Sequence, residues 1–303
     1  MSTNDIPLVA EAEAKVPPAV TRGSRMGKAS RQTRGMLVSD VVLIATLLAV
    51  VAMVLVPGWI APYSPTEFNP AVAMMPPSWE YPFGTDEFGR DILSRVIHGA
   101  RPTLVVAIAG AIMGVGLGTV TGLLAGYAGG RTDEVLMRFM DALMSFPTLI
   151  LATLIVVMLG SNPVNVIAAI GIVFWPRSAR IARAVAQDVA QRSFIEAAWV
   201  RGESHAYILF RELLPGVLNV VVVDLSLRIT YGTMLSASLS YLGIGVTPPT
   251  PAWGLMVKDG QQFIQFASWM VIWPCVAISV VAVAAVLAGE RLRQILAPTE
   301  RGN

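Results

Sequence analysis

The sequence has few charged residues. Only 14% of its 303 residues are charged, while 54% are hydrophobic. A soluble domain usually carries about 25% charged residues, so this deficit and the long uncharged runs indicate a protein of the bilayer. The formal net charge is only +2, which is too small to suggest nucleic acid as a partner.

Cysteine and histidine are almost absent. A single cysteine, Cys275, excludes an internal disulfide and a cysteine metal cluster, and its apolar neighbours predict a buried, unreactive thiol. The only two histidines, His98 and His205, fall on opposite sides of the membrane in the topology derived below. They cannot share one metal, and we predict no metal site.

Nucleotide-binding and catalytic motifs are also missing. The nearest approach to a phosphate-binding GxxxxGK[ST] loop is Gly27-Lys28-Ala29, which lacks the upstream glycine and the hydroxyl. No GxSxG elbow, HExxH pair or comparable nucleophile and base pattern is found. We therefore expect a non-catalytic chain that binds no cofactor itself, so that any ATP and its Mg²⁺ would bind a partner.

Long apolar runs are what the sequence has instead. Most of them are long enough to cross a hydrocarbon core of about 30 Å as helices. The shortest, residues 164–175, would by itself suggest an interfacial segment, but we expect its helix to continue through Arg177, Arg180 and Arg183. Tryptophans 59, 175, 253 and 269 fall near the expected span ends, as interface anchors do. The runs are residues 41–56, 102–127, 143–159, 164–175, 217–241 and 268–287.

The distribution of basic residues orients these spans. With the N-terminus inside, six spans place 17 of the 22 lysines and arginines in the cytoplasm, 4 outside and Arg228 within a span. Cytoplasmic loops are enriched in Lys and Arg, so this split supports six spans with both termini cytoplasmic. Without a crossing at residues 164–175, the six arginines of residues 176–216 would lie outside.

This topology divides the chain into five parts. We expect a disordered basic cytoplasmic tail, a first transmembrane helix, an extracytoplasmic segment, a five-helix core with a polar loop at residues 187–216, and a cytoplasmic tail. The corresponding ranges are residues 1–36, 37–57, 58–100, 101–290 and 291–303.

The second span carries a glycine at every fourth position. A ridge without side chains allows another helix to approach closely, so we expect tight helix packing here, with a gating hinge as the lesser alternative. The ridge consists of Gly110, Gly114, Gly118, Gly122 and Gly126.

The longest cytoplasmic loop contains the most informative polar segment, residues 194–215. Strong helix formers at Glu196-Ala197-Ala198 predict a short helix that Gly202 ends, and Ser204 can begin a second helix. Leu214-Pro215 then closes the unit before the fifth span. Periodicity alone gives an ordinary amphipathic surface loop about equal standing.

The spacing of Glu196-Ala197-Ala198, Gly202 and Leu214-Pro215 resembles the EAA loop of permease subunits of binding-protein-dependent ABC importers. Three further segments resemble the dipeptide, oligopeptide and nickel permeases of that family. They are Pro82-Phe83-Gly84-Thr85-Asp86 with Gly89-Arg90-Asp91 and Ser94-Arg95; Ala125-Gly126-Tyr127 with Asp141 and Ser145-Phe146-Pro147; and Leu239-Ser240-Tyr241-Leu242-Gly243 with Pro248-Pro249 and Trp253-Gly254.

The resemblance covers roughly residues 80–296 and implies an all-α polytopic membrane protein with the type I importer permease fold. It implies a cytoplasmic coupling helix that seats on an ATPase subunit, and import of peptides or related small solutes across a bacterial inner membrane. The implied partners are a homologous second permease subunit, two ATP-binding subunits, an extracytoplasmic substrate-binding protein and membrane lipid. One departure is Ser236, where the family has an acidic residue.

Three residues are candidates for the translocation path. Asp224 and Arg228 lie four residues apart on one helical face within the fifth span, and Tyr231 follows on the same helix. Ionisable groups at membrane depth are paired or face a bundle interior or an aqueous cavity. A mutual pair and a path-lining role both remain open, as does an alternative, stand-alone secondary transporter coupled to an ion through Asp224.

The charged segment before the second span has two interpretations. It could contact a binding protein, or it could be a solvated amphipathic lip. The residues concerned are Asp86, Glu87, Arg90, Asp91 and Arg95.

Overall fold

The computed structural model describes residues 40–296. The predicted basic tail, residues 1–36, lies outside the described residues, as do residues 297–303 of the predicted C-terminal tail. The chain divides into two units, residues 1–42 and 43–303, and every contact reported below lies within the second.

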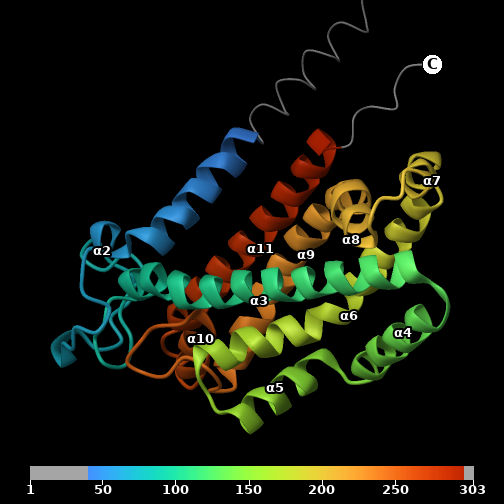
Figure 1. Ribbon diagram of the computed structural model, residues 1–303. Coiled ribbons are helices and arrows are strands. Elements are labelled where there is room, and N and C mark those ends of the chain that lie inside the picture. Colours follow the sequence, from blue (N-terminus) through green and yellow to red (C-terminus); the bar gives the residue numbers. More distant parts are fainter. Residues whose placement is uncertain (1–39, 297–303) are drawn as a thin grey trace, which may run out of the picture. The chain divides into compact units, whose positions relative to one another are not determined.

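The regular elements of the described residues are all helices, as expected (Figure 1). Outside them, Thr85 and Asp91 form an isolated antiparallel bridge. The elements are α1 (Asp40–Leu55), α2 (Pro57–Ile60), η1 (Pro70–Val72), α3 (Ile92–Ala128), α4 (Gly130–Met144), α5 (Thr148–Leu159), α6 (Pro163–Ala190), α7 (Ser193–Val200), α8 (His205–Tyr207), η2 (Ile208–Leu213), α9 (Leu214–Tyr241), α10 (Trp253–Gln261) and α11 (Trp269–Leu296).

Four helical stretches of the described residues are long and apolar enough to cross a membrane, and a fifth is obtained if α4 and α5 count as one bent span. The four are α3, α6, the continuous stretch His205–Tyr241, and α11 as far as Gln294. The apolar helix α1 is shorter. The number of six spans therefore stays a prediction.

Helices α3 and α6 pack along the glycine ridge, as the sequence predicts. A Cβ placed on Gly118 would lie 2.5 Å from Ser178 Cβ, and one on Gly122 would lie 2.5 Å from the carbonyl oxygen of Ala179. The remaining ridge glycines meet α6 at similarly short distances. Hydrogen at these positions is what allows the two backbones to approach, so the ridge is a packing surface.

Helix α6 runs without interruption from Pro163 to Ala190, although Pro176 lies inside it. Asn162 caps its first turn, because its side chain accepts a hydrogen bond from the backbone N–H of Asn165. The expectation that this helix continues past residue 175 into the arginine-rich turn is confirmed.

The third apolar run differs from the expected straight helix. Helix α4 ends at Met144, α5 begins at Thr148, and the two meet at an angle of 89°. Pro147 has no backbone N–H and disfavours the helical conformation at Phe146, which explains the break. The α5 helix alone rises only about 18 Å, at 1.5 Å per residue.

Two further expectations are wrong. Trp253 is completely buried and donates from Nε1 to the carbonyl oxygen of Val96 at 2.8 Å, so it fixes α10 to α3 and is no interface anchor. Cys275 is exposed on α11, so its thiol is not buried within this chain. Apolar neighbours in sequence did not imply burial, because much of the apolar surface of α11 faces outward.

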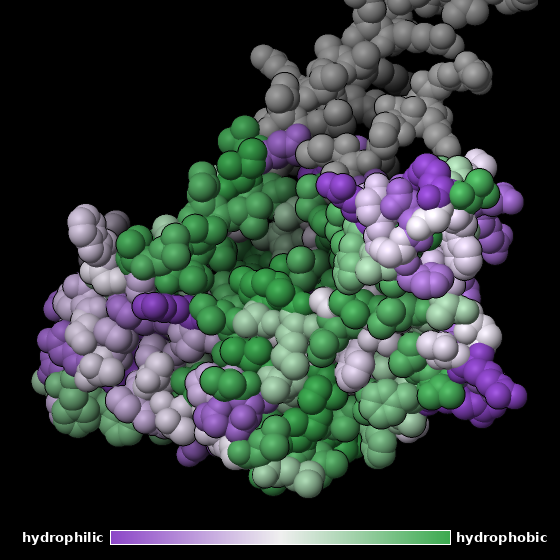
Figure 2. Space-filling model, in the orientation of Figure 1, coloured by the Kyte–Doolittle hydropathy of each residue, from purple (hydrophilic) through white to green (hydrophobic). Residues whose placement is uncertain are grey.

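Apolar side chains cover the middle of the face seen in Figure 2. Hydrophilic residues gather at one end over α7 and α8, and at the other over the segment that precedes α3 (Figures 1 and 2). Large exposed apolar side chains lie on the transmembrane helices, among them Ile112, Val120, Leu227, Val280 and Val283. An apolar band between two polar ends is the pattern that a bilayer imposes.

Candidate functional site

The loop predicted from the Glu-Ala-Ala pattern is a helix, a turn and a second helix. Helix α7 buries Ile195 and Ala198 and leaves Glu196 and Ala197 exposed. The buried pair packs in an apolar cluster with residues of α6, η2 and α9 (Ala186, Val189, Ile208, Leu213 and Val217). This cluster packs the loop against α6 and α9.

Gly202 ends the first helix, as the sequence predicts. Its φ is +74°, in the left-handed region that favours glycine, and its N–H donates to the carbonyl oxygen of Trp199 at 2.9 Å. No heavy atom lies within 4 Å of the position a Cβ would take. The requirement is therefore for backbone conformation and not for close approach.

The second half of the loop begins as expected and ends differently. Ser204 caps α8 by accepting from the N–H of Tyr207 at 3.2 Å. The helix then passes through the π-helical η2 and continues as α9, forming one stretch, His205–Tyr241. Leu214 and Pro215 lie in the first turn of α9 and do not interrupt it. The π-helical η2 ends two residues before Pro215, and the helix continues through both.

An aromatic cluster that the sequence did not predict joins this loop to α3. The hydroxyl of Tyr127 lies 2.7 Å from Nδ1 of His205, and the Trp199 ring meets the His205 ring edge-on at 5.5 Å. Nothing in the sequence places residue 127 beside residue 205. The contact connects the end of α3 to both halves of the loop.

The outer surface of the loop exposes large apolar side chains, although it lies at a hydrophilic end of the molecule (Figure 2). Phe194, Trp199, Val200 and Phe210 are all more than 40% exposed, and Val200 reaches 85%. A cleft of about 410 Å³ beside Glu196 is lined by Tyr127, Ala190, Gln191, Arg192, Ile195, Glu196 and Trp199. Exposed apolar residues around a cleft are typical of a protein-binding surface.

Asp224 and Arg228 form a buried ion pair in α9. Arg228 Nη2 lies 2.9 Å from Asp224 Oδ1, and the hydroxyl of Ser178 donates to Asp224 Oδ2 at 2.5 Å. The guanidinium lies over the Phe174 ring, 5.7 Å from its centroid. Both side chains are less than a tenth exposed. The geometry therefore shows the mutual pair, which is compatible with a path-lining role.

A cavity of about 340 Å³ opens beside this pair, between α5, α6 and α9. Arg228 and Tyr231 line it, whereas Asp224 does not. Arg177, which the sequence suggested only as part of an orienting basic turn, lines it as well. Ser236, at the position where the family has an acidic residue, is buried in α9 away from this cavity and donates to the carbonyl oxygen of Thr103 at 3.2 Å.

The charged segment before α3 is not a solvated lip, because Asp86, Asp91 and Arg95 are buried. Arg90 Nε donates to Asp86 Oδ2 at 2.6 Å, and Arg95 Nη1 donates to the carbonyl oxygen of Pro65 at 3.2 Å. Because Arg95 belongs to α3, its contact with Pro65 ties the segment to that helix.

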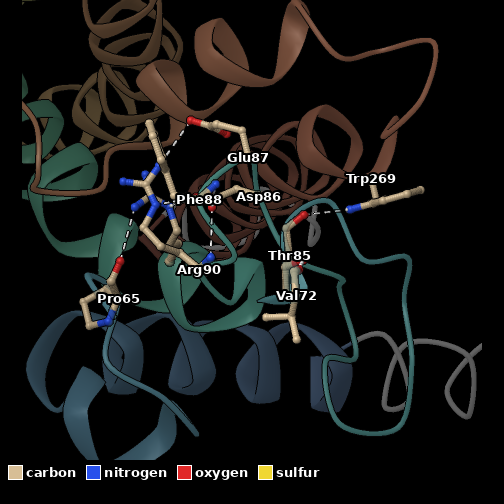
Figure 3. Close-up of polar contacts among 9 residues, drawn as sticks. Pro65, Val72, Thr85, Asp86, Glu87, Phe88, Arg90 and Trp269 are labelled. Carbon is tan, nitrogen blue, oxygen red and sulfur yellow. Dashed lines mark hydrogen bonds and ion pairs between the residues drawn. The ribbon is translucent and has the colours of Figure 1, made fainter. Parts of the chain in front are cut away.

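Two backbone and capping contacts complete this tie. Asp91 caps α3, since its carboxylate accepts from the N–H of Ser94 at 2.8 Å. The indole of Trp269, at the start of α11, donates to the carbonyl oxygen of Thr85 at 3.1 Å (Figure 3). The segment thus joins α3 to α11 at the end opposite the loop.

Two carboxyl groups beside this network have raised pKa values. Burial raises the pKa of Glu87, and the neighbouring Asp86 raises it further against the opposing effect of Arg90. Burial also raises the pKa of Asp259 in α10. The described residues contain no group of three or more His, Cys, Asp or Glu side chains suited to a metal ion.

The fold is that of an ABC importer permease. The solved structure of the MetNI methionine ABC transporter in an inward-facing conformation matches with a TM-score of 0.57 and 18% identity, over 68% of this chain and 98% of that one. At this identity the likeness shows the fold alone.

Sequence relatives give the family. Residues 118–302 match the model of the binding-protein-dependent transport system inner membrane components, and the chain belongs to this family. The di/tripeptide transport system permease protein DppC of Pseudomonas aeruginosa is 35% identical, over 83% of this chain and 85% of that protein. The glutathione transport system permease protein GsiD of Pectobacterium atrosepticum is 39% identical, over 73% and 74%.

These matches support a multi-pass inner-membrane permease of an ABC importer over a stand-alone secondary transporter. They extend the resemblance seen in the Glu196 loop and in the three other segments to most of the chain.

Proposed function

We propose that this chain forms half of the translocation path of an ATP-driven importer for di- or oligopeptides or related small solutes. The relatives named for peptide transport support the substrate class. The observation that carries the proposal is the Glu196 loop, whose outer surface is exposed while its inner face is fixed to α6 and α9.

The proposed mechanism transmits motion through this loop. Two ATP-binding subunits, which hold the ATP and Mg²⁺ that this chain does not bind, close on the loops of this subunit and of a homologous second permease subunit. Glu196, Ala197, Ala198, Gly202, Leu214 and Pro215 form the coupling unit in this proposal. Because Ile195 and Ala198 pack against α6 and α9, movement of the loop is passed to the helices beside the cavity.

The remaining parts of the proposal concern orientation and the path. The excess of arginine and lysine supports a cytoplasmic position for both termini and the Glu196 loop, with the segment before α3 on the other side, where an extracytoplasmic binding protein would deliver the solute. Asp224, Arg228 and Tyr231 belong to the path, with Asp224 acting through Arg228. Catalysis of ATP hydrolysis is assigned entirely to the partners.

Two substitutions in the coupling loop test the proposal. The complex copurified with this chain is reconstituted in proteoliposomes with its binding protein, and ATP-dependent uptake of labelled dialanine is measured beside ATP hydrolysis. We expect Glu196→Lys and Gly202→Leu to reduce uptake at least about tenfold while the protein still inserts, since a branched side chain opposes a φ of +74°.

Glu134→Lys, a charge reversal at an exposed site on α4, is the matched control and should leave uptake unchanged. Wild-type uptake and ATPase stimulation in both loop variants would contradict the coupling role. Uptake that needs no ATP and follows an ion gradient would favour the secondary transporter instead.

A further inference from the structure

The charged side chains that line the cavity between α5, α6 and α9 are all positive. Two guanidinium groups line it, Arg177 from α6 and Arg228 from α9, and none of its lining residues is acidic. Asp224 lies behind Arg228 and balances that one charge. Arg177 is exposed and forms no ion pair or hydrogen bond within the described residues, so the cavity keeps one uncompensated positive charge.

Arg228 is almost enclosed at the cavity wall. Its side chain is 7% exposed, and its Nε atom is buried without a hydrogen-bond partner. An atom this buried cannot itself reach a solute, so what Arg228 contributes at the cavity wall is its positive charge. The contacts with Asp224 and Phe174 hold the group in place at the cavity wall.

The rest of the lining suits a small amphipathic solute. Thr148, Tyr231 and Ser238 bring hydroxyl groups, while Leu149, Val173, Phe174, Met234 and Leu235 bring apolar surface. A volume of about 340 Å³ falls at the lower end of the usual range for small-molecule sites.

We propose that Arg177 and Arg228 form a subsite for the free carboxylate of the solute as it passes. This inference rests on the proposed function and narrows its substrate class to small solutes with a carboxylate, such as peptides with an unmodified C-terminus. Arg228 is the fixed positive charge at the cavity wall, and Arg177 is the exposed charge that attracts the carboxylate and releases it again because its own side chain is solvated.

Direct binding tests the subsite without any transport step. The full chain is placed in nanodiscs of phosphatidylcholine, and saturation-transfer NMR measures its binding of N-acetyl-Ala-Ala and of the C-terminal amide of that peptide. Both probes lack an ammonium group, so they differ only in the carboxylate. We expect the acid to bind at least about threefold more tightly, as one partly exposed charge pair allows.

Arg177→Gln should bring the two affinities to about the same value. The matched control is Arg180→Gln, one turn further along α6, because Arg180 pairs with Asp141 and lies outside the cavity. Equal binding of acid and amide by the wild-type chain would overturn the proposal, as would an unchanged preference in Arg177→Gln or its equal loss in Arg180→Gln.

A lipid phosphate is the other anion that this cavity could take. Repeating the measurement in nanodiscs that contain phosphatidylglycerol separates the two sources. A preference for the acid that persists supports the solute assignment, and one that the anionic lipid abolishes overturns it. The proposed function itself fails by a different observation, the absence of ATP-dependent uptake.

Discussion

Asp224 and Arg228 of α9 depend on each other for charge compensation. Each is buried, and each has the other as its ion-pair partner. Removal of either leaves a charge in a region of low dielectric constant, at a cost on the order of 3–5 kcal/mol. We expect Asp224→Ala and Arg228→Ala each to lower membrane abundance, measured by quantitative immunoblotting of washed membranes.

The double variant Asp224→Ala/Arg228→Ala should recover part of this abundance, because it strands no charge. Its uptake of dialanine should remain impaired, since the cavity has lost the guanidinium of Arg228. Wild-type abundance and uptake in all three variants would show that the pair has neither role.

Removing the charge of Glu87 should stabilise the protein, in contrast to removing that of Asp224 or Arg228. Burial raises its pKa, so the folded protein binds a proton here more readily than the unfolded chain does. A carboxyl group with a raised folded pKa contributes its full stability below its unfolded pKa, and loses it as the pH rises through the folded value. At neutral pH and above, the ionised group therefore opposes folding.

Glu87→Gln should accordingly raise the melting temperature in detergent by about 2 °C at about pH 8, and the gain should shrink toward about pH 4. Glu134→Gln, which changes an exposed carboxylate of α4, is the control and should have no effect. A melting temperature that falls at about pH 8 would mean that the contact of Glu87 with Arg90 outweighs its burial.

At the scale of single elements, the packing of α3 on α6 depends on the size of the side chains on one face of α3. A leucine at Gly118 would collide with Ser178 Cβ and the backbone of Ala179, whereas a Cβ at Gly116 meets no atom within 4 Å. Gly118→Leu should therefore destabilise the fold by several kcal/mol and lower its yield in detergent.

Gly116→Leu is the matched control on the same helix, and it should fold with nearly wild-type yield. Size-exclusion profiles of the two purified variants make the comparison. Equal profiles would contradict the packing role of the ridge, and a Gly118→Leu protein that assembles normally but transports a different solute would favour the alternative of a functional hinge.

Regular patterns were what the sequence allowed us to predict at this scale. The spacing of the ridge glycines, the end of α7 at Gly202, and the continuation of α6 past residue 175 each follow from local chemistry, and the structure has all three. The break at Pro147 was missed, because apolar character continued across it.

Contacts between distant residues were not predictable from one sequence. Tyr127 meets His205, and Arg177 meets the cavity beside Arg228, only because α3, α6 and α9 pack together. Trp253 was expected at an interface and is buried for the same reason. Of the candidate site, the loop residues followed from a motif, while the cavity required the tertiary structure.

For the whole molecule, the distribution of basic residues predicts which side each loop occupies. Replacing Cys275, which is exposed and the only cysteine, by serine gives a background for labelling. Cysteines introduced at Thr132 and Ser204 should react with an impermeant maleimide only in inverted vesicles, and one at Ala71 only in spheroplasts. All three side chains are exposed.

These positions separate the competing topologies. With Thr132 reacting from the cytoplasm, reaction of the Ser204 position from the same side as Ala71 would mean that either the bent α4–α5 pair or α6 does not cross the membrane. Reaction of all three from one side would contradict the six-span topology altogether.

The central claim is that this chain carries solute while partner subunits hydrolyse ATP. The most direct measurement is the subunit stoichiometry of the complex purified through a tag on this chain from its own membrane in mild detergent, by quantitative mass spectrometry. We predict two copies of ATP-binding subunits with a GxxxxGK[ST] loop, and one homologous permease, for each copy of this chain. Purification of the chain without any ATP-binding subunit, from membranes that still import the solute, would contradict the account.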